Sequence, residues 1–233
     1  MGDESVTFDE WVEWAFDHPV AAEGGKEWWW HVPRDWKGGR WLDRPPEQAL
    51  AYVAKLFENP VTYLSSYSDA QIDQGINFIV SRACSKHFEW LVDQRVDHAL
   101  RAGCIRSLEK LFRDLLAPRC SDNVWIYTKP LNHICDMLWD IVVRGADTAE
   151  RNPDGTYRLV RDSEIDKVVL DTLAHVLAIP SVACQQSALH GLGHLVHDAK
   201  LGSEVIQQYL DDHPNLRSDL RRYAFIAMFG GVL

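Results

Sequence analysis

Three histidines occur close together in residues 187–199, with the sequence SALHGLGHLVHDA. On a helix, His190 and His194, or His194 and His197, could place two imidazoles on one zinc or other transition metal ion. His190 and His197 would lie about 10 Å apart along the helix axis, too far to share an ion without strain. A metal site at this segment therefore needs a third ligand from another part of the chain.

Several acidic residues and histidines elsewhere could supply this ligand. The candidates are His175, Asp198 and the stretch HICDMLWD, in which His133, Asp136 and Asp140 share one helical face. Hydrolysis would also need a general base, and the residue after His190, where an HExxH metalloprotease carries its glutamate, is Gly191. The sequence favours a structural or recognition role for the three histidines, with a metal site as the alternative.

The histidine segment has the pattern of an amphipathic helix. At 100° per residue, Leu192 and Leu195 fall on one side and the three histidines fall on the opposite side. Gln186 lies beside the histidines, so this polar side could line a binding groove. Gly191 and Gly193 each lower helix stability by about 1 kcal/mol and would permit the close approach of a neighbouring helix.

The elements that must position these residues are predicted to be helices. Three-to-four periodicity runs through nearly the whole chain and alternating strand-like runs are almost absent, which predicts an all-α fold. A first helix should begin after Thr7, in a capping box with Glu10, and end near His18. The stretch RNPDGTYR at 151–158 indicates a polar turn. Further helices are expected at 46–58, 70–85, 95–116, 131–144, 163–177, 182–199, 203–212 and 217–229.

Weak internal repetition relates the last helices to one another. CQQSALHGLGHL from Cys184 aligns with LRRYAFIAMFGG from Leu220 at an offset of 36 residues, which places Leu189 over Phe225. Each segment follows a shorter helix and a proline-marked corner. A period of about 35 to 40 residues with two helices per unit predicts stacked antiparallel helical hairpins, with an irregular bundle as the alternative.

This repetition resembles HEAT-like or armadillo-type α-solenoids, and CQQSALHGLGHL in particular is similar to the second helix of degenerate HEAT-like repeats in bacterial proteins. The resemblance is clearest over 160–233 and rests on helix pattern alone in the rest of 46–233. It implies an α–α superhelix that binds another macromolecule, and it brings no catalytic residues. We expect one all-helical domain over 1–233, in which 1–45 form a first helix and an irregular cap.

The irregular segment 21–46 is rich in tryptophan. The tryptophans are Trp28, Trp29, Trp30, Trp36 and Trp41. They could form an aromatic platform for a ligand such as a sugar or peptide, or they could cover the exposed end of the helical stack. The second interpretation is favoured.

Composition excludes several classes of partner. The chain has 24 Lys and Arg against 34 Asp and Glu, and its net charge of −10 disfavours binding to nucleic acid or to an anionic membrane. Five cysteines without a CxxC pair disfavour a disulfide framework and indicate a reducing compartment. No apolar run of about 18 residues and no secretion signal is present, so a cytoplasmic location is expected.

These patterns lead to two expectations of function. The first is a non-enzymatic scaffold without a cofactor that recognises a protein partner, in which the acidic charge would suit an immunity or inhibitor role against a basic protein. The alternative is a metal-binding protein or metal-dependent hydrolase that uses His190, His194 and His197. The apolar C-terminal stretch AFIAMFGGVL could in addition mediate homo-oligomer formation.

Overall fold

The computed structural model of the chain is predominantly helical. It describes residues 6–20, 26–31, 45–81, 84–85, 87–122, 129–144, 147–151 and 157–232. The helices are α1 (Phe8–Phe16), α3 (Pro46–Glu58), α4 (Pro60–Leu64), α5 (Asp69–Val80), α6 (His98–Lys110), α7 (Ala117–Arg119), α8 (Leu131–Arg144), α9 (Ser163–Leu177), α10 (Val182–Ala199), α11 (Ser203–Asp212) and α12 (Ser218–Met228), with the 3₁₀ turns η1 (Trp28–His31) and η2 (His87–Leu91) and the π-helical η3 (Leu111–Leu116). Within the described chain, none of them has the length and apolar character needed to cross a membrane.

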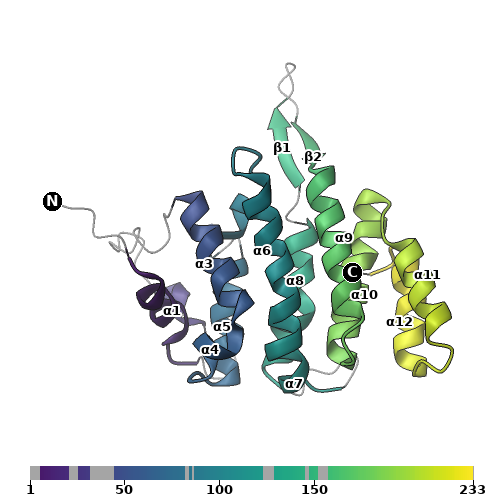
Figure 1. Ribbon diagram of the computed structural model, residues 1–233, viewed down its shortest axis with the longest axis horizontal. Coiled ribbons are helices and arrows are strands. Elements are labelled where there is room, and N and C mark those ends of the chain that lie inside the picture. The colour runs from purple at the N-terminus through teal and green to yellow at the C-terminus, as the bar shows by residue number, and fades with distance from the viewer. Residues whose placement is uncertain are drawn as a thin grey trace.

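The helices pack in two layers (Figure 1). One layer contains α3, α6 and α9 in succession, and the other contains α1, α5, α8, α10 and α12 in succession. The layers meet where α9 packs on α10, and α11 packs on both α10 and α12. Helix α10 lies in the interior of this arrangement, because it contacts α8, α9, α11 and α12. Most side chains of α10 are therefore buried against other helices.

The core is continuous along both layers. Buried apolar side chains extend from Val6 to Val232 in one connected cluster. Its largest fully buried side chains include Trp11 and Trp139, and the Trp139 ring stacks on Phe112 with ring centroids 5.6 Å apart. Aromatic side chains of this kind each bury about 150–250 Å² and carry much of the energy of a core. Trp139 and Phe112 thereby hold α8 against the preceding η3.

The sequence predicts the bounds of most helices correctly. The observed α3, α8, α9, α10 and α11 have the predicted bounds. Helix α1 begins after Thr7, whose side-chain oxygen accepts from the Glu10 N–H at 3.3 Å, while the Glu10 carboxylate accepts from the Thr7 N–H at 2.8 Å. This confirms the predicted capping box.

The bounds of α5, α6 and α12 differ from the prediction. Helix α5 ends at Val80 rather than at residue 85, because Ser81 has an extended backbone with ψ of 120°. Helix α6 begins at His98 rather than at residue 95, because the Asp97 side chain caps it by accepting from the Leu100 N–H at 3.1 Å. Helix α12 is one residue shorter at each end than predicted.

A β-hairpin occupies the region where the sequence indicates a polar turn. Strand β1 (Asp147–Arg151) pairs with β2 (Tyr157–Arg161) in antiparallel register, with Asp147 opposite Arg161. Tyr157 and Val160 are residue types that favour strands, but runs of five residues give only a weak alternating pattern. The hairpin connects α8 to α9 and projects beyond the helical layers in Figure 1. Apart from this hairpin, the regular elements of the described chain are helical, as predicted.

Candidate metal centre

Helix α10 carries the three histidines, and the structure separates them into a pair and a single residue. His190 and His194 are each 5% exposed, whereas the His197 side chain is 70% exposed. His197 Nδ1 lies 2.6 Å from Asp198 Oδ1 in the last turn of the helix. Of the three, only His190 and His194 face a common site. They lie in the part of α10 that packs against α8 and α12, as Gly191 and Gly193 between them do.

The pair meets a carboxylate from the neighbouring helix. Asp140 on α8 places Oδ1 3.1 Å from His190 Nε2 and in direct contact with His194 Nε2. The two Nε2 atoms are 3.2 Å apart, and one ligand atom from each of the three residues lies within 4.8 Å of the others. The Asp140 side chain is 17% exposed, so solvent reaches the edge of this cluster. Asp140, His190 and His194 together form the candidate metal centre.

The spacing of these ligand atoms fits a transition metal ion. Zinc holds nitrogen and oxygen ligands at about 2.0–2.1 Å in a tetrahedron, which puts neighbouring ligand atoms about 3.3 Å apart. The separations of 3.1 and 3.2 Å that involve His190 Nε2 are close to this value. The direct contact between His194 and Asp140 would open as an ion enters. Three protein ligands leave the fourth position of a tetrahedral ion open, as in catalytic rather than structural zinc sites.

Tyr223 on α12 orients His190 from the other side. Its hydroxyl oxygen lies 2.5 Å from His190 Nδ1, and the two rings are nearly parallel, at 10°. A histidine that binds metal through Nε2 carries its proton on Nδ1, and this N–H is usually held by an oxygen. Tyr223 provides that oxygen and fixes the ring for metal binding through Nε2.

The electrostatics of the cluster keep Asp140 charged. Burial acts to raise the pKa of the Asp140 carboxyl, but its contacts with the ring nitrogens of His190 and His194 lower the pKa by more. The net pKa is well below the ordinary value for an aspartic acid. Asp140 is therefore ionised at neutral pH, which is the state that binds a cation.

Two glycines allow the helices that carry the cluster to pack closely. A Cβ atom at Gly191 would lie 2.7 Å from the Leu173 side chain and 2.8 Å from Trp139 Cβ. A Cβ atom at Gly193 would lie 2.6 Å from the Val232 side chain. The structure confirms the close approach that the glycines predict. At Gly191 this approach brings α10 against α8 at Trp139, the residue directly before Asp140.

The other predicted metal ligands lie outside the cluster. His175 Nδ1 is 3.9 Å from Asp171 one turn earlier on α9, and Asp198 pairs with His197. His133 Nδ1 lies 3.4 Å from Asp73 on α5. Asp136, one turn before Asp140, accepts from the Gln186 side chain at 3.2 Å. Gln186 is itself buried, one turn before His190.

The tryptophans that could form an aromatic platform differ in their burial. Trp28 is buried and stacks on His18 with ring centroids 3.7 Å apart, and it also contacts Trp14 and Phe78. Trp29 is half-buried and Trp30 is exposed. Trp36 and Trp41 lie outside the described residues.

The five cysteines lie in or beside the core. Cys104 and Cys184 are buried and Cys84 is half-buried. Burial raises the pKa of the Cys104 thiol and of the Cys84 thiol. A high pKa disfavours the thiolate that a nucleophilic cysteine would need.

Sequence reasoning missed Tyr223, although the internal repetition contains a signal for it. At the offset of 36 residues, Tyr223 aligns with Ser187. Ser187 donates to the Cys135 carbonyl oxygen on α8, and Tyr223 reaches His190 on α10. Ser187 on α10 thus contacts α8, and Tyr223 on α12 contacts α10. Each residue contacts the helix that precedes its own helix in the same layer.

Comparison with protein-family models, with curated proteins and with solved structures finds no match to this chain.

Proposed function

We propose that this chain is a HEAT-like helical array that binds a transition metal ion, with zinc as the best fit, through Asp140, His190 and His194. The observation that carries the proposal is the convergence of three ligand atoms from two helices within 4.8 Å of one another. Imidazole and carboxylate are ligands that zinc accepts, and the contact to Tyr223 provides the outer support typical of such sites.

The same geometry is harder to explain by hydrogen bonds alone. Without a metal ion, His190 and His194 both direct Nε2 at the single oxygen Asp140 Oδ1, although their own Nε2 atoms are only 3.2 Å apart. If both nitrogens carried protons, the two N–H groups would crowd one another beside that oxygen. A cation in this position would instead accept a lone pair from each of the three ligand atoms.

The chemistry suited to such a centre is metal-assisted hydrolysis. A three-ligand ion with an open position can polarise a substrate oxygen and lower the pKa of a bound water. Asp136 lies one turn before Asp140 on α8, so their Cβ atoms are about 5–6 Å apart. We propose Asp136 as the general base for a water bound to the ion.

Recognition of a protein partner is a second candidate function. It is favoured by the exposed aromatic side chains Phe225 and Phe229 on the outer side of α12, the end of its layer within the described chain. The net charge of −10 favours a basic partner. Light scattering and co-purification of wild type and Phe229→Ser would test this function, because loss of a complex in the variant is expected. A strict monomer that captures no protein would contradict it.

Metal content tests the metal function directly. The untagged protein, purified without chelator, is expected to contain about one zinc or other transition metal ion per chain by mass spectrometry. In titrations against a competing chelator, Asp140→Asn and His194→Ala should each weaken zinc binding by about 100-fold. Loss of a residue that only supports a ligand already weakens metal affinity by about 10–100-fold, and loss of a ligand should cost at least as much. His197→Ala is the matched control, because this exposed histidine lies on the same helix outside the cluster.

Circular dichroism of each variant shows whether its fold is intact, and Asp140→Asn keeps the shape of the side chain. Unchanged zinc affinity in folded Asp140→Asn and His194→Ala, or the same loss in His197→Ala, would contradict the proposed centre.

A further inference from the structure

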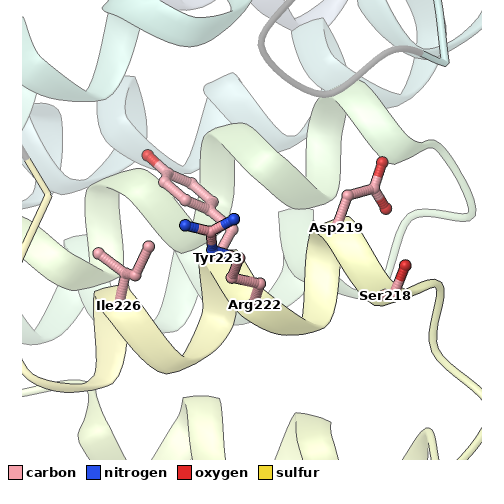
Figure 2. Close-up of a pocket in the computed structure, with 5 residues that line it drawn as sticks. All are labelled: Ser218, Asp219, Arg222, Tyr223 and Ile226. Atoms are coloured by element: carbon pink, nitrogen blue, oxygen red, sulfur yellow. The ribbon is translucent and has the colours of Figure 1, made fainter.

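A pocket lies along α12 and includes Tyr223, the residue that contacts His190 of the candidate metal centre. Figure 2 shows the residues that line it, and the pocket has a volume of about 630 Å³. Its described lining residues are Ser218, Asp219, Arg222, Tyr223 and Ile226. Small-molecule sites typically measure about 300–1,000 Å³. Tyr223 belongs to both features, because its ring lines the pocket while its hydroxyl contacts His190.

The charge available in this pocket is positive. Asp219 is already paired, since Arg217 Nε and Nη2 donate to its two carboxylate oxygens at 2.7 and 2.6 Å. The guanidinium of Arg222 is exposed, and it forms no ion pair with the residues that the structure describes. An unpaired guanidinium favours a carboxylate or phosphate group, which it can bind through two parallel hydrogen bonds.

The rest of the pocket wall is largely apolar. Figure 2 shows Tyr223 and Ile226 pointing to the same side of α12 as Arg222. An aromatic ring and a branched aliphatic side chain next to one cation suit a ligand that has an apolar body and a single anionic group. A simple inorganic anion would leave the apolar wall uncovered.

Metal binding should favour an anion in this pocket. A divalent ion held by ionised Asp140 adds a net charge of about +1, and Tyr223, which lines the pocket, contacts the proposed metal ligand His190. Because linkage is reciprocal, an anion in the pocket should raise the affinity for the metal by the same factor.

We propose that this pocket binds a small organic anion, a carboxylate or a phosphate monoester, through Arg222, with its apolar body against Tyr223 and Ile226. The link between anion and metal rests on the proposed function, whereas the contact with Arg222 does not.

Calorimetric titration with benzoate and with phenyl phosphate tests this proposal, and benzyltrimethylammonium serves as the cationic probe of similar size. The zinc-loaded wild type should bind at least one anion and not the cation, and the preferred anion identifies the charged group. Arg222→Gln should weaken anion binding about tenfold, as expected for loss of a charged hydrogen bond. Arg106→Gln, which removes an exposed arginine from α6, is the matched control and should bind as wild type does.

The same titrations on metal-free protein separate the two proposals. Anion binding is expected to be at least about fivefold weaker without zinc. If zinc binds but no anion does, or if Arg222→Gln binds the anion as wild type does, the pocket proposal is wrong and the metal centre stands. If the chain takes up no metal yet binds the anion in an Arg222-dependent way, the pocket is supported and the metal function is wrong.

Discussion

Helices α10 and α12 carry the two segments that align at an offset of 36 residues, yet their surroundings differ. Leu189 on α10 is fully buried, whereas Phe225, which aligns with it at the offset of 36 residues, is 49% exposed. Helix α10 has α8 on one side and α12 on the other, while α12 has a layer neighbour on one side only within the described chain. Apolar residues at aligned positions, Leu189 and Phe225, are therefore buried on α10 and half-exposed on α12.

This difference explains why the candidate chemistry is found on α10. His190 receives a carboxylate from α8 and a hydroxyl from α12, so its ring is fixed from both sides. The position aligned with His190 on α12 is Ile226, and the position aligned with His194 is Gly230. A metal centre between helices needs residues from the helices on either side. Within the described chain, α10 has a neighbour on each side in its layer, whereas α12 has a neighbour on one side only.

Truncation of the two aligned apolar residues gives the largest expected contrast. Leu189→Ala should lower the free energy of unfolding by about 3 kcal/mol, since it removes a fully buried side chain from a packed core. Phe225→Ala should cost less than about 1 kcal/mol, because half of that side chain already contacts water. Urea denaturation measures both. Equal losses would mean that another surface covers α12 in solution.

Addition of one methyl group at the contact between α8 and α10 should have an intermediate effect. Gly191→Ala would place Cβ 2.8 Å from Trp139 Cβ, and the overlap should destabilise the fold by about 1–3 kcal/mol. The matched control is Gly103→Ala on α6, where nothing lies within 4 Å of the new atom. The control should be stabilising by about 0.5–1 kcal/mol. Thermal unfolding compares them, and a neutral Gly191→Ala would show that the helices separate easily.

Acidification should produce the smallest effect on the free energy of unfolding, through Asp140 in the candidate metal centre. The pKa of Asp140 is lower in the folded chain than in the unfolded chain. Its stabilising contribution is therefore fully present above the unfolded value near pH 4 and is lost as the pH falls through the lower folded value. The stability difference between metal-free wild type and Asp140→Asn should be larger at pH 5 than at pH 2.5. A constant difference in denaturation midpoints at both pH values would contradict this.

The candidate site was only partly accessible from the sequence. The spacing of His190 and His194 identifies two ligands, because positions four apart on a helix always share a face. Asp140 was one of several possible third ligands, and the sequence could not select it, since it lies 50 residues from His190. His197 follows the same spacing rule but lies in the last turn of α10, where its side chain is exposed.

Most of the longer helices can be predicted from local sequence, because periodicity and caps such as Thr7 with Glu10 act within a few residues of one another. The two short strands of the hairpin escaped the same reasoning, since five residues give too little pattern. Packing between helices sets which polar residues of α10 are buried and which of them contact Asp140 and Tyr223. Burial depends on the neighbours that a helix acquires on packing, and these are set by contacts between residues far apart in the chain.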